Sequence, residues 1–417
     1  MKDNLRKTLT TFQGSAILLN IVIGAGLLTL PGLAVKEAGS NALYAWLICA
    51  VVAAPLVAVF IILGRLYPNA GGVAFYAQRA LGSFGRRSAA FLLIGAVIFG
   101  LPSIALTGGH YLASVFPGSP FFYALLLLIG SILPHLAAGD SASKMMAILA
   151  SGVLFSMGLF LAVGFFTLNP TSLAGLSQPV DWHEALSPFA MLFFAFTGWE
   201  IGAGIAEEFI NPRRDFPVAM ALSFFIVTGL YLAVAYVTAL TDLDGHWEAP
   251  FVVFVKPVLG NYGATSVALM AAVIVFANLS GALWGVSRLV YSLGRDSIFP
   301  EILAATQDGK PLRAVSITAL VLVMVLGFYG IGLISLDVML GMAGQNFLIL
   351  YGLAAISLFI LSKNRPARVL SVCVILLVGG FLALQGIKLL YPIGLVVLAA
   401  ITDFWAFDTP HRRPEKI

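Results

Sequence analysis

The chain has 417 residues, 60% of them hydrophobic and only 10% charged, with a formal net charge of +4. Several apolar runs reach the roughly 20 residues that cross a bilayer as a helix, which excludes a soluble domain. No run alternates in polarity as the strands of a membrane barrel do, and the two cysteines, Cys49 and Cys373, offer neither a disulfide framework nor a metal site. We therefore expect an all-α polytopic membrane protein that holds no metal and no cofactor.

We assign the apolar runs to twelve transmembrane helices. They are residues 12–35, 42–63, 88–116, 120–138, 144–167, 187–208, 217–241, 263–287, 312–334, 338–361, 367–385 and 388–406. If the N-terminus is inside, Lys36, Lys256 and Lys388 are the only basic residues in the outer segments. Because basic residues concentrate on the cytoplasmic side, this distribution places residues 1–11 and the tail 407–417 in the cytoplasm.

The first span is interrupted by glycines near its middle. It reads Ile-Gly-Ala-Gly at residues 23–26, and Pro31 follows. Glycine allows close backbone approach and unusual dihedral angles, so amides freed at this point can face an anion. A Gly-x-Gly packing notch between helices explains the same residues equally well.

The sixth span combines glycine with a carboxylate at membrane depth. Gly198 and Glu200 lie in mid-span, where a charged side chain costs about 2.5–3.5 kcal/mol or more. Such a group normally faces a cavity or a partner, so we interpret the stretch as a ligand site with an apolar wall of Phe194, Phe196 and Trp199. The alternative is a kinked packing helix in which Glu200 is simply hydrogen-bonded.

Two loops end in the same pattern of leucine, glycine, a polar residue, an aromatic residue and glycine. They end at residues 81–85 and 259–263, and each follows a glycine-broken span at a similar distance. An offset of five spans reverses orientation, so we predict an inverted repeat of residues 12–167 against residues 187–361, with the substrate at the midplane between the broken helices. Residues 367–406 lie outside the repeat and would serve packing or an oligomer contact.

Other polar residues at membrane depth carry weaker signals. His110 and His135 are each either a proton relay or hydrogen-bonded packing near an interface. The eighth span offers Asn278, Ser280 and Trp284. These three either line a pocket or hold neighbouring helices together.

Glu200 also suggests how transport is coupled to an ion. A buried carboxylate resists ionisation, so it can exchange a proton. Glu207 follows seven residues later, two turns along the same helical face, and leads toward the cytoplasm. The two carboxylates would form a proton route, unless Glu200 stays ionised and only binds amides of the broken helices.

These motifs together resemble the amino acid–polyamine–organocation transporter superfamily. Residues 23–26 are similar to its broken first helix, residues 196–200 and 207–217 to its sixth helix and the following turn, and residues 67–72 and 294–300 to its other recurring loops. The stretch 63–74 and the chain length are similar to those of bacterial exporters of methionine and branched-chain amino acids. The resemblance implies a fold like that of the bacterial leucine transporter, with alternating access around a central site.

Carried over by position, the resemblance assigns the substrate's contacts to backbone groups. Amides near Ala25 and Gly26 would bind its carboxylate, and carbonyls near Val22, Phe194 and Thr197 its ammonium. The whole site would comprise Val22, Ile23, Gly24, Ala25, Gly26, Phe194, Phe196, Thr197, Gly198 and Trp199. Many proton-coupled relatives carry a lysine midway along the fifth helix, where this chain has Val153 or Leu154, so the choice between proton and sodium is left open.

We predict a secondary transporter of neutral, hydrophobic amino acids (methionine, leucine, isoleucine and valine) in the bacterial inner membrane, which exports them by antiport with protons. An uptake permease or exchanger of the same fold is the alternative. A membrane enzyme would need a cluster of reactive polar side chains that this chain lacks, and no nucleotide-binding glycine loop supports an ATP-driven pump. Fold alone does not separate a transporter from a sensor on the same scaffold. The expected partners are the amino acid, protons and the lipid bilayer, with no nucleic acid; a homo-oligomer is compatible with the sequence.

Overall fold

The computed structural model describes residues 7–24, 26–136, 158, 161–166, 179–295, 298–307 and 311–407. Over these residues the regular structure is helical, and an isolated parallel bridge joins Leu9 and Phe209. Eight helical segments of the described chain are long and apolar enough to cross a membrane. The protein is therefore an all-α, multi-pass membrane protein, as its composition predicts.

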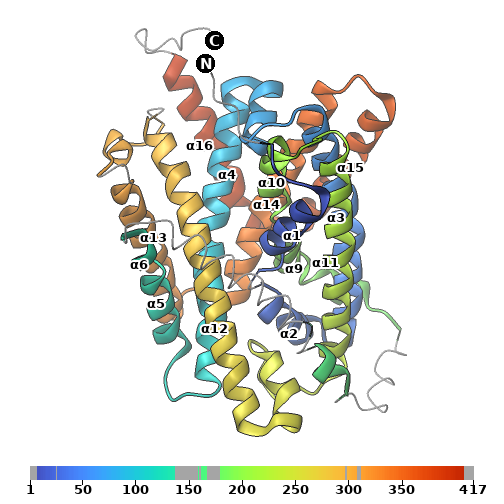
Figure 1. Ribbon diagram of the computed structural model, residues 1–417, viewed down its shortest axis with the longest axis vertical. Coiled ribbons are helices and arrows are strands. Elements are labelled where there is room, and N and C mark those ends of the chain that lie inside the picture. The colour runs from blue at the N-terminus through green and yellow to red at the C-terminus, as the bar shows by residue number, and fades with distance from the viewer. Residues whose placement is uncertain are drawn as a thin grey trace.

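The helices form one elongated bundle (Figure 1). In chain order the α-helices are α1 (Thr11–Val22), α2 (Gly26–Ala38), α3 (Ala42–Leu66), α4 (Gly72–Ala113), α5 (Pro120–Gly130), α6 (Leu133–Leu136), α8 (Trp182–Leu186), α9 (Phe189–Phe193), α10 (Trp199–Gly204), α11 (Asp215–Ala239), α12 (Pro250–Arg295), α13 (Leu312–Gly330), α14 (Leu336–Leu361), α15 (Arg365–Ala383) and α16 (Leu390–Phe407). Two short 3-10 helices matter for the site, η3 (Phe194–Phe196) and η4 (Ile205–Glu208).

Most of the predicted spans correspond to these helices. The helices α3, α11, α13, α14 and α15 each cover one predicted span, whereas the first span is divided between α1 and α2, and the sixth between α9, η3 and α10. The predicted fifth span, residues 144–167, lies outside the described residues except at 158 and 161–166. The number of twelve helices therefore stays a prediction.

Both glycine-rich stretches interrupt their helices where the sequence predicts a break. α1 ends at Val22 and α2 begins at Gly26, and Ile23 between them has non-helical dihedral angles, with φ −76° and ψ 82°. In the other stretch η3 ends at Phe196, and Gly198 has a φ of +107°. A side chain strains the backbone in this left-handed region, but glycine does not. Gly198 therefore lets α10 start in a new direction directly after η3.

The two matching loop endings form the same backbone kink. α4 and α12 each contain one residue with non-helical dihedral angles, Gly82 (φ 69°, ψ −151°) and Gly260 (φ 60°, ψ −155°). Each glycine separates a short helical piece from the long remainder of its helix. The two short pieces lie at opposite ends of the bundle (Figure 1). That placement is the one an inverted repeat requires.

α14 packs in the middle of the bundle, against α4, α9 and α15. Its approach to α9 is backbone against backbone, because a Cβ atom built on Gly344 would lie only 1.8 Å from the carbonyl oxygen of Ala190. Gly344 is buried, and α9 leads straight into the break at residues 194–198. Because Gly344 has no side chain, α9 can lie directly against α14, and this contact positions the second break.

We expect Gly344→Ala to lower the free energy of unfolding by about 1–3 kcal/mol, because the added methyl group must displace the backbone of α9. The matched control is Gly341→Ala on the same helix, where an added Cβ meets no atom within 4 Å. Thermal unfolding of the purified protein in detergent measures both variants. Equal melting temperatures for Gly344→Ala and the wild type would contradict the close packing of α9 and α14.

Candidate functional site

A cavity of about 780 Å³ lies between the two breaks. Of the predicted substrate-binding and coupling residues, those that line it are Val22, Ile23, Gly24, Gly26, Phe194, Thr197, Gly198 and Glu200. They come from stretches almost 180 positions apart in the sequence. The fold thus brings the two glycine-rich segments to the same cavity.

At the first break the freed backbone groups are bound within the protein. The Gly24 amide donates to the Val22 carbonyl oxygen at 2.9 Å, and the Tyr231 hydroxyl of α11 donates to the same oxygen at 2.9 Å. The Tyr231 ring packs edge-on against Phe196 and Trp46, with ring centroids 5.3 and 5.6 Å away. This aromatic cluster therefore holds the end of α1 in place.

At the second break a carboxylate binds the freed amide. The Gly198 amide donates to Oε2 of Glu200 at 2.9 Å, and the Tyr351 hydroxyl of α14 donates to the same oxygen at 2.5 Å. An acidic side chain at the first turn of a helix also interacts favourably with the helix dipole. Glu200 is only 4% exposed, and its other oxygen, Oε1, accepts no hydrogen bond from the described residues. One oxygen thus supports the break, and the other is buried without a partner among the described residues.

The three carbonyls expected to receive the substrate ammonium differ in what already binds them. The Val22 oxygen has the two donors described above. The Phe194 oxygen also has two, the Thr197 hydroxyl at 2.7 Å and the Thr197 amide at 3.3 Å. A carbonyl oxygen has two lone pairs. Among the described residues, the Thr197 carbonyl accepts no such bond, so it is the acceptor still open to a ligand.

The predicted apolar wall is only partly correct. Phe194 lines the cavity, but Phe196 and Trp199 are absent from its lining and fully buried elsewhere. Phe196 packs into the cluster with Trp46 and Tyr231, and Trp199 packs against Phe224 of α11 at 5.9 Å. Phe194 and Phe196 lie two positions apart on the 3-10 helix η3 and therefore point in different directions, whereas Trp199 follows the turn at Gly198 as the first residue of α10.

Glu200 and Glu207 do not lie on one continuous α-helix. α10 ends at Gly204, and Glu207 lies in the 3-10 helix η4. Glu207 does not line the cavity. Its Oε2 accepts a hydrogen bond from the Ala70 amide at 3.0 Å, so it holds the turn between α3 and α4.

The cavity extends toward one end of the bundle and is closed at the other. Its lining includes Ala70 and Gly72 at the start of α4, and Leu289 near the end of α12. At the opposite end, a Cβ atom built on Gly32 of α2 would lie 2.0 Å from the Trp247 carbonyl oxygen. The Tyr111 hydroxyl of α4 donates to the Leu28 carbonyl of α2 at 2.7 Å. α2 is therefore packed tightly against the segment 240–249, which lies between α11 and α12.

The sequence alone did not show whether three residues of this site bind there or only pack between helices. Tyr231 and Tyr351 bind the two breaks from α11 and α14, yet each is a single tyrosine in an apolar helix. Asn278 of α12, which was left open between pocket and packing, does line the cavity. Only the arrangement of the helices distinguishes such residues from their neighbours.

Some predicted positions lie outside the described residues. They are Ala25 at the first break and Val153 and Leu154 in the predicted fifth span. The side chains of His135 and Trp284 are likewise not described. The backbone binding of Ala25 and the departure at the fifth helix therefore stay predictions.

The sequence is similar to those of known transport proteins over most of its length. Residues 9–407 match the family described as amino acid permease. The chain is 28% identical to the uncharacterized amino acid permease YecA of Bacillus subtilis over 97% of this chain and 96% of that protein. It is 28% identical to the L-methionine/branched-chain amino acid exporter YjeH of Escherichia coli over 99% of both chains. It is also 29% identical to the mouse Asc-type amino acid transporter 1, over 87% of this chain and 72% of that protein.

The family and these relatives are named as permeases, transporters or exporters rather than as enzymes. The family match covers both breaks, both kinked helices and the α14–α16 region. The chain is therefore a member of the amino acid permease family, within the amino acid–polyamine–organocation superfamily.

Proposed function

We propose that this protein exports neutral, apolar amino acids across the bacterial inner membrane in exchange for protons. The observation that carries the proposal is the cavity between two broken helices, whose lining includes the residues at both breaks and one charged side chain, Glu200. The carboxylate of an amino acid needs hydrogen-bond donors, and its ammonium needs acceptors. Backbone amides and carbonyls at two helix breaks beside one cavity would supply both.

The topology belongs to the same proposal. Twelve spans, with residues 12–167 and 187–361 as inverted repeats, residues 367–406 as two added helices and both termini in the cytoplasm, would place the cavity near the midplane. The similar dihedral angles of Gly82 and Gly260 support the repeat. In this orientation the cavity extends toward the cytoplasm, and the packed end of α2 faces outward.

The substrate would be held mainly by backbone. Gly26 begins α2, and the first amides of a helix lack partners within it and favour an anion. We therefore place the carboxylate at Gly26 and Ala25. The ammonium is placed at the Thr197 carbonyl.

The rest of the lining favours an apolar side chain. Phe194 and Phe347 line the cavity together with Leu101 and Ile104 of α4. Among the lining residues, Glu200 is the one with a charged side chain, and it is engaged with Gly198 and Tyr351. A basic or acidic substrate side chain would therefore enter without a partner for its charge, at a cost of several kcal/mol.

Glu200 is the candidate proton carrier within the cavity. Its Oε2 holds the break while Oε1 stays available, so a proton can bind without first breaking the bonds to Gly198 and Tyr351. Glu207 would extend the route toward the cytoplasm only through the turn it binds at Ala70. A transporter works in either direction, and the gradients across the membrane set the direction of net transport. The proposal of export rather than uptake is therefore supported by the likeness to the exporter YjeH.

Replacing Gly26 with leucine should abolish amino acid binding while leaving expression intact. A Cβ at Gly26 points toward Phe194 and Ala195, at 3.7 Å from Phe194 Cδ1 and 3.9 Å from Ala195 Cα, so a longer side chain fills the gap between the breaks. Gly229→Leu is the matched control, because its Cβ meets no atom within 4 Å. Binding of radiolabelled leucine to purified protein measures the effect. Normal binding by Gly26→Leu would place the carboxylate elsewhere.

Substrate competition should favour apolar side chains. We expect methionine and leucine to displace labelled leucine at concentrations at least about tenfold below those of arginine or glutamate, which corresponds to about 1.4 kcal/mol. The reason is the absence of a free charged partner in the cavity. Proteoliposomes that contain only this protein provide the assay. Stronger competition by arginine or glutamate would refute the apolar pocket.

Glu200→Gln should keep amino acid exchange but lose the dependence of net transport on a proton gradient. Glutamine keeps an oxygen acceptor for Gly198 and Tyr351, but it cannot carry a proton. Glu208→Gln, a neighbouring acid absent from the cavity lining, is the control and should behave as the wild type. Exchange and net transport are measured separately over a series of pH values. A Glu200→Gln variant with wild-type net transport and full pH dependence would exclude Glu200 as the coupling group.

A further inference from the structure

A groove lies on the outer surface of the bundle between α14 and α15, away from the cavity. It has a volume of about 290 Å³ and is lined by Phe359 of α14 and by Arg368, Val369, Val372 and Cys373 of α15. Of the eight candidate membrane helices in the described chain, α15 has the smallest share of buried residues. The groove therefore faces the bilayer, and Arg368 is its one charged residue.

The Arg368 side chain is held at the end of the groove nearest the start of α15. Its Nε donates to the Ser362 carbonyl at 2.8 Å, and the centre of its guanidinium group lies 5.5 Å from the centre of the Phe359 ring. Within the described chain, its Nη1 and Nη2 atoms have no hydrogen bond or ion pair. Arginine uses these nitrogens as a fork that binds two oxygens of a phosphate or carboxylate. The groove thus carries a fixed anion-binding group at one end.

Two further cations accompany Arg368 at the start of α15. Lys363 and Arg365 are exposed, and Arg365 lies on the same face as Arg368 because residues three apart on a helix are neighbours. Residues 338–402 contain no aspartate or glutamate. In the described part of the chain, neither Lys363 nor Arg365 forms an ion pair. The start of α15 is therefore a cluster of three cations beside an apolar groove.

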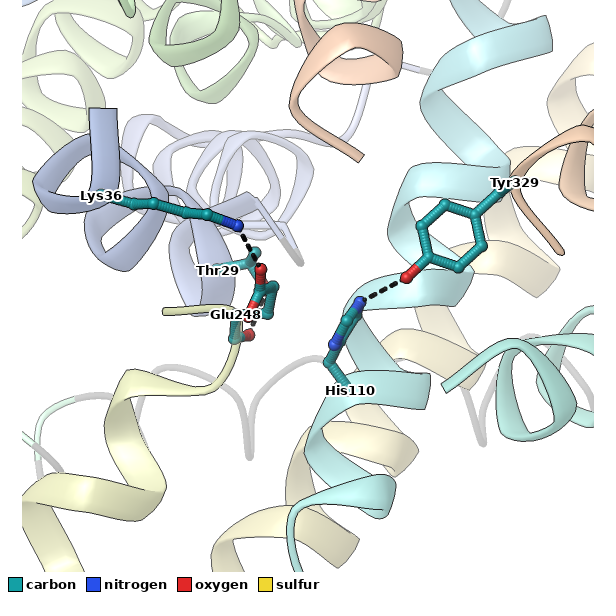
Figure 2. Close-up of polar contacts among 5 residues, drawn as sticks. All are labelled: Thr29, Lys36, His110, Glu248 and Tyr329. Carbon is teal, nitrogen blue, oxygen red and sulfur yellow. Dashed lines mark hydrogen bonds and ion pairs between the residues drawn. The ribbon is translucent and has the colours of Figure 1, made fainter. Parts of the chain in front are cut away.

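Two other cations of the described chain have acidic partners. Lys36, although its side chain is half exposed, pairs with Glu248 at 3.0 Å (Figure 2), and Arg87 pairs with Asp403 at 3.3 Å. Cations at the first turn of a helix also oppose the helix dipole, which favours negative charge there. The three cations of α15 therefore repel one another and the end of the helix, and an anion from outside the chain would relieve both repulsions.

The cluster lies at the end of the bundle toward which the cavity extends. The Tyr67 hydroxyl, just after α3, donates to the Leu361 carbonyl at 3.2 Å, and the guanidinium group of Arg79 lies 4.6 Å from the centre of the Tyr67 ring. Ala70, three residues after Tyr67, lines the cavity. In the proposed orientation this end is cytoplasmic, and the membrane surface on that side is negatively charged. The groove therefore opens to the leaflet that holds anionic lipid.

We propose that the groove binds one anionic phospholipid, with the phosphate at Arg365 and Arg368 and part of an acyl chain against Phe359 and Val372. Lipid is the neighbour that a membrane-facing groove meets, and an anionic headgroup adds the charge that the cluster lacks. A zwitterionic headgroup brings an ammonium group that the three cations repel. Basic pockets between transmembrane helices on the cytoplasmic side bind anionic headgroups by the same chemistry. The choice of leaflet rests on the proposed orientation, whereas lipid binding itself does not depend on the transported substrate.

The first test measures which lipid the purified full-length protein retains. Native mass spectrometry follows the binding of one phosphatidylglycerol or one phosphatidylcholine with identical acyl chains. We expect phosphatidylglycerol to bind at least about fivefold more tightly, because each basic residue contributes about 1 kcal/mol near an anionic surface. Raised salt should weaken this binding. Equal binding of the two lipids by the wild type would overturn the proposal.

Single substitutions locate the headgroup. Arg365→Gln and Arg368→Gln should each weaken the binding of phosphatidylglycerol about fivefold. In the described chain the Arg365 side chain has no hydrogen bond, so its replacement removes charge without removing a structural contact. Arg313→Gln is the matched control, because Arg313 is exposed in the first turn of α13 and does not line the groove. Wild-type lipid binding by both Arg365→Gln and Arg368→Gln would contradict the proposed headgroup site.

The apolar part of the site is tested by narrowing the groove. Val372→Phe adds a ring there and leaves every charge in place, so phosphatidylglycerol should bind several-fold more weakly. The control is Leu376→Phe, one turn later at a side chain that is 70% exposed and outside the groove. Unchanged binding by Val372→Phe would leave only a general attraction between charges and would refute the groove. A dimer that Val372→Phe abolishes and phosphatidylglycerol does not displace would place a second copy of the chain on this face instead of lipid.

The lipid site and the transport site have separate readouts. No residue lines both the groove and the cavity, so leucine binding by Arg365→Gln should match that of the wild type. Absence of leucine binding in the wild type would refute amino acid transport and leave the lipid measurements valid. Intact leucine binding together with equal binding of the two lipids would refute the lipid site alone.

Discussion

The bond between the Glu200 carboxylate and the Gly198 amide is the interaction on which the centre of the molecule depends. A helix broken inside a membrane leaves amides and carbonyls without partners, and each costs several kcal/mol in hydrocarbon. Glu200 satisfies the amide at the start of α10, and Tyr351 joins the same oxygen from α14. Burying the carboxylate or the amide alone would cost free energy at this depth, and the hydrogen bond between them lowers both costs.

The first break is satisfied in a different way, which leaves a defined set of groups for a ligand. The Tyr231 hydroxyl donates a hydrogen bond to the Val22 carbonyl. A neutral side chain thus binds the backbone at the end of α1, whereas a carboxylate binds it at the start of α10. The start of α2 and Thr197 line the cavity, whereas Oε1 of Glu200 is buried and has no partner among the described residues. The groups at the cavity match the two charged groups of an amino acid better than they match any side chain of a substrate.

Two glycines of α2 have different roles, one at its start and one at its middle. Gly26 leaves the gap between the breaks open, whereas Gly32 lets α2 press against the backbone of Trp247. Backbone-to-backbone contacts of this kind, together with that of Gly344 on α9, do not deform gradually and instead come apart as units. The ion pair of Lys36 with Glu248 joins the same two elements at a more exposed point.

The sequence by itself determined the membrane class and both helix breaks, because each follows from local chain chemistry: apolar length, the dihedral freedom of glycine and the cost of a buried charge. It also matched the endings at residues 81–85 and 259–263, which it assigned to loops and the structure shows as kinks at Gly82 and Gly260 within α4 and α12. The sequence did not determine which side chains face the cavity. Phe196 points away from the cavity because it lies two positions after Phe194 on a 3-10 helix, Trp199 follows the turn at Gly198, and Glu207 lies beyond the end of α10. Tyr231, Tyr351 and Asn278 joined the site only through the packing of α11, α14 and α12. Contacts between distant helices depend on how whole helices pack, and the local pattern of one segment carries no information about the partner that completes it.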